Sequence, residues 1–85
     1  MRRILMLVTE PTQNLVAIVK AAVDGGVDIV QYRDRHSTDS ERLGLASRLR
    51  DVTRGRALLV VNTSAQLAVD VDADGVHLPE TEGLV

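Results

Sequence analysis

Residues 30–35 read Val-Gln-Tyr-Arg-Asp-Arg, which places an amide and two guanidinium groups at every second position. Successive side chains of a β-strand point to opposite faces, so an extended backbone here sends Gln31, Arg33 and Arg35 to one side. A guanidinium group stays charged and matches phosphate oxygens with paired hydrogen bonds, and an amide can orient an anion or read the edge of a heterocycle. The spacing therefore indicates a site for a phosphate-like anion.

The same residues also fit a simpler arrangement. In a solvated loop the two arginines would pair with nearby carboxylates, and the candidates are Asp28, Asp34 and Asp39. Exposed ion pairs of this kind are common and contribute little to stability, so the spacing alone leaves both interpretations open.

Further polar residues follow or interrupt apolar runs later in the chain. Asn62 ends such a run and is either a second ligand for the anion or the N-cap of a helix that begins near Ser64. His77 lies within an apolar segment, where a core histidine bonded to the backbone is the commoner case. Glu80 and Glu82 follow in a loop and are candidate ligands for a divalent metal.

Strand-like and helix-like segments alternate and must position these residues. Strand-like segments cover residues 4–9, 27–33, 57–62 and 73–78, and the first is a continuous apolar run typical of a strand covered on both faces. Helical periodicity and helix-end signals predict helices over residues 15–24, 39–54 and 64–71. Thr38 followed by Glu41 three residues later indicates a capping box at the start of the second helix.

The order βαβαβαβ predicts a parallel sheet with right-handed crossovers. It fits an open flavodoxin-like sheet or the first half of a (β/α)₈ barrel, the TIM barrel. In both folds the chemistry lies at the carboxyl ends of the strands, which is where the glutamine, the arginines and the asparagine are expected. No Gly-x-Gly-x-x-Gly or Walker-type loop follows any of the strands, which argues against a nucleotide-binding version.

Composition narrows the classes of function. The 85 residues carry a net charge of −2 and one aromatic residue, a tyrosine, so neither nucleic acid nor an anionic membrane surface is an expected partner. There is no cysteine, which favours a reducing, cytoplasmic setting. The apolar stretch Ile4–Val8 is too short for a signal segment or a membrane span.

Two longer stretches resemble the thiamine phosphate synthase/TenI family. GGVDIVQYRDRHST, residues 25–38, is similar to the family's Gln-x-Arg-[Glu/Asp]-Lys stretch at the end of its second strand. LLVVNTSAQLAVDVDADGVHLPE, residues 58–80, is similar to its Asn-Asp stretch followed by Ala-Asp-Gly-[Val/Ile]-His. The two matches come in the family's order and span most of the chain.

The resemblance implies a (β/α)₈ barrel of about 200 residues. The synthase of this family joins hydroxymethylpyrimidine pyrophosphate to thiazole phosphate and releases pyrophosphate, with Mg²⁺ bound. Gln31, Arg33 and Asn62 match positions that hold the pyrimidine pyrophosphate. Arg35 lies where the family has lysine, which keeps the charge but not the shape.

Departures from the family pattern bear on the metal and on the activity. Thr63 replaces the aspartate that binds Mg²⁺, and of the later acidic loop only Glu82 matches the second ligand, which puts the Mg²⁺ cofactor in doubt. TenI-type members, which tautomerise a thiazole carboxylate phosphate, lack this metal pair and are the alternative. Asp72 lies where relatives have glycine, and aspartate tolerates a left-handed backbone.

Residues 1–85 are expected to form one partial barrel domain with about four strands and three helices. Its open flank predicts self-association or pairing with a missing C-terminal half. We expect no complete synthase or tautomerase turnover from these residues alone. A non-catalytic half-barrel that binds a phosphorylated ligand or takes part in an assembly is the third possibility.

Overall fold

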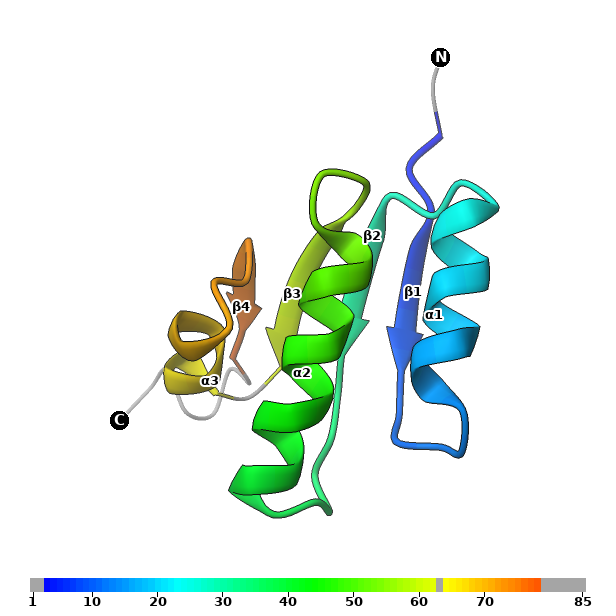
Figure 1. Cartoon of the computed structure of the whole chain (residues 1–85). Coiled ribbons are helices and arrows are strands. Elements are labelled where there is room, and N and C mark those ends of the chain that lie inside the picture. Colours follow the sequence, from blue (N-terminus) through cyan, green and yellow to red (C-terminus); the bar gives the residue numbers. More distant parts are fainter. Residues whose placement is uncertain (1–2, 63, 79–85) are drawn as a thin grey trace.

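Four parallel strands form one sheet in the computed structural model, which describes residues 3–62 and 64–78 (Figure 1). The elements in chain order are β1 (Met6–Thr9), α1 (Leu15–Asp24), β2 (Ile29–Tyr32), α2 (Asp39–Thr53), β3 (Leu58–Asn62), α3 (Ala65–Asp70) and β4 (Gly75–His77). The predicted alternation of strands and helices is confirmed, with each strand shorter than the sequence predicts. No helix in these described ranges is long and apolar enough to span a membrane.

The strand order separates the two folds that the sequence left open. The strands are neighbours in the sequential order β1-β2-β3-β4, and all three pairs are parallel. Figure 1 shows α1, α2 and α3 on the same face of this sheet. A doubly wound sheet reverses its strand order at a switch point and carries helices on both faces. The sequential order with helices on one face is instead the arrangement of the first half of a (β/α)₈ barrel.

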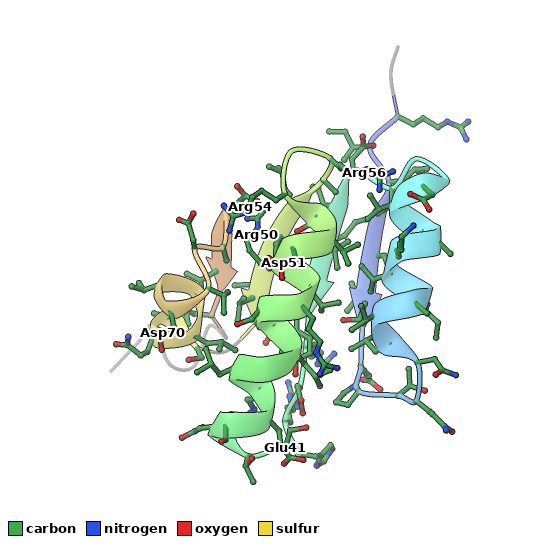
Figure 2. All side chains as sticks on the ribbon, viewed as in Figure 1. Glu41, Arg50, Asp51, Arg54, Arg56 and Asp70 are labelled. Carbon is green, nitrogen blue, oxygen red and sulfur yellow. The ribbon has the colours of Figure 1, made fainter. Side chains whose placement is uncertain are left out.

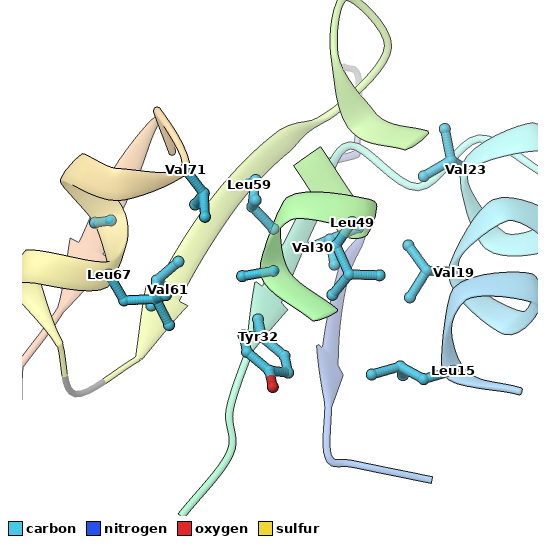
Figure 3. Packing of buried hydrophobic residues seen from close by; sticks show 12 residues of the cluster. Leu15, Val19, Val23, Val30, Tyr32, Leu49, Leu59, Val61, Leu67 and Val71 are labelled. Atoms are coloured by element: carbon cyan, nitrogen blue, oxygen red, sulfur yellow. The ribbon is translucent and has the colours of Figure 1, made fainter. Parts of the chain in front are cut away.

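The hydrophobic core lies between the sheet and the three helices (Figure 3). Alternate strand residues point into it, and Val30, Tyr32, Leu59 and Val61 are each at most 1% exposed. The helices contribute Leu15, Val19, Val23, Ala46, Leu49, Leu67 and Ala68. Because strand side chains alternate, the residues between these core residues point to the face of the sheet away from the helices.

The face of the sheet opposite the helices is uncovered in the described chain. Met6, Val8 and Leu58 lie on it and are 54%, 49% and 50% exposed. The prediction that the first strand is covered on both faces is therefore wrong for the described residues. Its apolar run reflects two apolar faces, of which the helices cover one.

The ends of the helices follow the predicted local chemistry. The capping box is confirmed, since Glu41 N donates to Thr38 Oγ1 at 3.2 Å and Thr38 N donates to Glu41 Oε1 at 2.9 Å. The chain leaves α2 through Gly55 at φ 74°, a conformation that favours glycine. Asp72 has φ 56°, so the left-handed backbone expected there is confirmed.

Candidate functional site

The carboxyl ends of the strands gather the residues that the sequence analysis singled out. Tyr32 of β2 is in register with Val61 of β3, so the residues that follow them, Arg33 and Asn62, lie side by side. Gln31 lies one alternation earlier, and these three residues fall on the face opposite the helices. We call Gln31, Arg33, Arg35 and Asn62 the carboxyl-edge group.

The backbone of Arg33 is held to the neighbouring strand. Arg33 N donates to Thr9 O at 3.0 Å, and Thr9 Oγ1 donates to Gln31 O at 3.2 Å. Gln31 and Arg33 are half-buried, whereas Arg35 is exposed. These bonds continue the β1–β2 pairing one residue beyond the strand, so the predicted alternation at Gln31 and Arg33 holds although β2 itself ends at Tyr32.

Neither arginine of the carboxyl-edge group forms an ion pair with another residue of the described chain. Two of the three carboxylates considered as partners of these arginines have other contacts. Asp39 Oδ1 lies 3.7 Å from Arg42 Nη1, and Asp28 Oδ2 accepts a hydrogen bond from Leu5 N at 3.0 Å. The third, Asp34, lies on the other face. The ion-paired loop is therefore not what this part of the chain forms, and the guanidinium groups keep their hydrogen-bonding capacity for a ligand.

Asp34 instead fixes the segment that carries the arginines. It is 3% exposed and accepts hydrogen bonds from Tyr32 Oη at 2.6 Å, His36 N at 3.1 Å and Ser37 N at 3.0 Å. Burial acts to raise the pKa of Asp34, but the hydrogen bonds from Ser37, Tyr32 and His36 outweigh it and lower the pKa to about 2. Burial and the neighbouring carboxylate raise the pKa of Tyr32. Sequence reasoning missed this role, although the alternation places both side chains on one face.

Asn62 and His77 meet across β3 and β4. Their Cα atoms are register partners, and Asn62 Nδ2 lies 3.1 Å from His77 Nδ1. The N-cap of α3 is Ser64, whose Oγ accepts a hydrogen bond from Leu67 N at 3.0 Å, so the capping role considered for Asn62 is wrong. His77 is exposed, so its interpretation as a core histidine is wrong too. The short strand β4 lies at the edge of the sheet, and no element of the described chain covers that side.

A buried arginine joins α2 to the residues just before β4, at the amino ends of the strands. Arg50 Nη1 donates to Asp74 Oδ2 at 2.9 Å and to Asp72 O at 3.1 Å, and Asp74 Oδ2 also accepts from Leu59 N at 2.8 Å. Figure 2 shows Arg50 of α2 and Arg54, which follows the helix, on the side of α2 toward β4. The bond from Leu59 N and the Arg50 guanidinium lower the pKa of Asp74 against the opposing effect of burial. Together with the β3–β4 pairing, this contact holds the segment that leads into β4 and His77.

Two hollows lie away from the carboxyl-edge group. One of about 630 Å³ is lined by Ile4, Ile29 and Leu58 among others, and a smaller one of about 310 Å³ lies between α2 and α3. Neither is lined by Gln31, Arg33 or Asn62. The carboxyl-edge group is thus one open wall, without an opposing wall in the described chain.

The residues that the structure describes contain no group of three or more histidine, aspartate or glutamate side chains placed to hold a metal ion. Thr63 and Glu82, the two positions that bear on the predicted metal site, lie outside the described residues, as does Glu80. The described side chains therefore do not fit an Mg²⁺ site on their own, and we derive no step through a metal.

A comparison with protein families shows which family the chain belongs to. A family model described as thiamine monophosphate synthase, TMP-TENI, matches residues 5–84. The match includes all the strands and helices of the described structure and the whole carboxyl-edge group. The chain belongs to this family.

Individual members of the thiamine monophosphate synthase family also align with most of this chain. Thiamine-phosphate synthases of Synechocystis sp. and Natronomonas pharaonis are each 48% identical, over 79 and 71 residues. The alignments cover 92% and 82% of this chain but 23% and 33% of those proteins. A solved thiamine phosphate pyrophosphorylase from Pyrococcus furiosus matches with a TM-score of 0.76 and 30% identity, over 86% of this chain and 38% of that one. The chain thus spans well under half the length of these relatives.

Proposed function

We propose that the carboxyl-edge group is the pyrophosphate-binding wall of a thiamine phosphate synthase. In the reaction of that enzyme, hydroxymethylpyrimidine pyrophosphate joins thiazole phosphate and pyrophosphate departs. The observation that supports this most directly is Arg33, a half-buried residue without a carboxylate partner in the described chain, whose backbone is held at the strand end beside Gln31. An unpaired cation of this kind favours an anionic ligand.

The proposed roles divide among the group. Arg33 and Arg35 neutralise and orient the pyrophosphate, Asn62 hydrogen-bonds to it, and Gln31 reads the pyrimidine edge or the anion. The partner is a small phosphorylated substrate, and the proposed setting is the cytoplasm. Because the chain spans 23% to 38% of the length of these relatives, the proposed wall that faces the thiazole phosphate belongs to the part of the barrel that these 85 residues do not match.

A TenI-like tautomerase remains the second candidate because of one residue. Thr63 presents a hydroxyl where synthases carry an Mg²⁺-binding aspartate, and Mg²⁺ prefers charged oxygen ligands. Pyrophosphate affinity measured with and without Mg²⁺ separates the two: a strong gain with the metal supports the synthase, and no gain supports the tautomerase.

Calorimetric titration of the purified 85-residue chain with inorganic pyrophosphate tests the proposed wall. We expect Arg33→Gln to weaken binding about tenfold or more, since hydrogen bonds to charged groups contribute about 1.5–3 kcal/mol each. Arg48→Gln removes the same charge from an exposed position on α2 and is the matched control. It should change the affinity by less than about twofold at fixed ionic strength. Equal losses in the two variants would show that pyrophosphate binds through net charge alone and would contradict the proposal.

A further inference from the structure

The contact between His77 and Asn62 has no part in the roles assigned above. The two residues come from neighbouring strands and are register partners at the carboxyl edge. Their side chains are joined by the 3.1 Å contact between Asn62 Nδ2 and His77 Nδ1. A histidine therefore contacts a residue of the proposed pyrophosphate wall directly, from a strand that supplies none of the carboxyl-edge group.

The chemistry of the two atoms fixes the direction of the hydrogen bond. An amide nitrogen of asparagine can only donate, so Nδ1 of His77 must accept. A neutral imidazole that accepts at Nδ1 carries its proton on Nε2. The contact therefore specifies one tautomer of His77.

The same bond specifies one orientation of the amide. The terminal torsion of an asparagine side chain is broad and roughly two-fold, so the oxygen and the nitrogen can exchange places at little cost. Reversing the Asn62 amide would bring its oxygen against Nδ1, and a hydrogen bond would then form only if the imidazole proton moved from Nε2 to Nδ1. With the proton on Nε2, the bond to His77 thus keeps the amide nitrogen of Asn62 toward β4.

We propose that His77 is a positioning residue that orients the Asn62 amide for the anion bound at the carboxyl edge. It acts through Asn62. The identity of the anion rests on the proposed function, whereas the orientation of the amide does not.

The first test reads the tautomer directly and needs no ligand. Nitrogen-15 NMR of the imidazole in the 85-residue chain, at about pH 8 where an ordinary histidine is neutral, distinguishes a protonated Nε2 from a protonated Nδ1. We expect the proton on Nε2. A proton on Nδ1 would overturn the proposal, because that atom could not then accept from Asn62.

Two substitutions of His77 test whether the hydrogen-bond acceptor at Nδ1, and not the size of the side chain, orients the Asn62 amide. His77→Asn places an amide oxygen where Nδ1 lies and keeps an acceptor for Asn62, whereas His77→Gln moves its amide one carbon further out. Both are neutral and polar at an exposed site, and backbone spectra verify that each variant folds. We expect the side-chain NH₂ signals of Asn62 to be kept in His77→Asn and to shift or broaden in His77→Gln.

Pyrophosphate titration of the same variants gives the functional readout. The affinity should stay within about twofold in His77→Asn and fall about threefold to tenfold in His77→Gln, the loss typical of one net hydrogen bond. Equal affinities in the two variants would overturn the proposal. If the unsubstituted chain binds no pyrophosphate, the proposed function fails, and the tautomer and the NH₂ signals still decide whether His77 orients Asn62.

Discussion

Asp34 determines how the arginine-bearing segment is held, although it contacts no ligand position itself. Its two carboxylate oxygens accept from Tyr32 Oη and from the backbone N–H groups of His36 and Ser37. Because Asp34 and Tyr32 occupy one face, Arg33 is left on the other. The Asp34 carboxylate, although it lies between the two arginines in the sequence, therefore accepts hydrogen bonds from Tyr32 and the backbone and forms no ion pair with either guanidinium group.

These hydrogen bonds make the stability of the chain depend on pH through Asp34. They lower the pKa of the folded carboxyl group from 3.8 to about 2. Because the folded value is the lower one, the contribution is fully present above about pH 4 and is lost as the pH falls toward 2. We expect the difference in unfolding free energy between the natural chain and Asp34→Asn to shrink over that interval in urea titrations.

Asp51→Asn is the matched control for this measurement, since Asp51 lies exposed on α2. The difference in unfolding free energy between the natural chain and the variant should shrink at low pH for Asp34→Asn and not for Asp51→Asn. A constant difference between the natural chain and Asp34→Asn from about pH 5 to about pH 2 would contradict the assignment of these bonds to the carboxylate.

In residues 31–34, the sequence analysis predicted the shared face of Gln31 and Arg33 but not the contact between Tyr32 and Asp34 on the other face. Period-two alternation correctly placed Gln31 and Arg33 together. The same alternation places Asp34 beside Tyr32, but the charges of its neighbours suggested an ion pair instead. His77 could not be assigned from its own apolar surroundings, because its exposure and its contact with Asn62 depend on which strand lies next to β4.

At the scale of the elements, the helix ends were the most predictable part and the strand ends the least. The Thr38 and Glu41 side chains act within one turn, so their pattern is readable in the sequence. Asn62 and Ser64 are both good caps, and the sequence alone did not choose between them. The choice follows from β3, which extends through Asn62 and is paired with β4 there.

The position of β4 depends on the buried Arg50–Asp74 contact. The Arg50 side chain is 6% exposed, and Asp74→Ala would leave its guanidinium, together with Leu59 N, without this carboxylate. Breaking a fully buried pair costs about 3–5 kcal/mol, and since Asp74 is 38% exposed we expect a loss of about 2 kcal/mol in unfolding free energy. Denaturant titration measures it.

Asp24→Ala is the comparison for that loss. Asp24 also accepts from two cationic side chains, Lys20 at 3.2 Å and Arg56 at 2.6 Å, but all three are well exposed. Solvent screening makes such pairs weak, so a markedly smaller loss is expected. Similar losses from Asp24→Ala and Asp74→Ala would mean that the burial of Arg50 contributes nothing.

At the scale of the whole molecule, the one-sided sheet is the dominant feature (Figure 1). The family pattern predicted a half-barrel, and the sequential strand order agrees with it. What the apolar runs could not show is that only one face would be covered. Hydrophobicity records that a face avoids water and does not identify the element that covers it.

The uncovered face leads us to expect self-association of the purified chain. Met6 and Val8 on β1 and Leu58 on β3, the two strands that flank β2, are about half exposed, and β1 and β4 each have only one strand neighbour in the described sheet. Apolar surface of this kind associates in water. In sedimentation velocity we expect a species larger than the 9.2 kDa monomer.

Charged substitutions test whether this face is responsible. Leu58→Glu places a carboxylate on the uncovered face and should shift the distribution toward monomer. Val69→Glu is the control, because Val69 is 74% exposed on α3, on the helical side. A natural chain that sediments as a monomer, or equal dissociation by both substitutions, would contradict the expectation.

The three hydrogen bonds to Asp34 also bear on the order of events during folding. The partners of Asp34 lie two or three residues away in the sequence, so closing these bonds requires only very short loops. The contact between Asn62 and His77, by contrast, spans 15 residues and needs two paired strands. The arginine-bearing bend can therefore reach its shape through local contacts, before the slower long-range pairing is complete. Three of the four residues of the carboxyl-edge group lie within five consecutive positions, 31–35, whereas the fourth, Asn62, meets His77 only once β3 and β4 lie side by side.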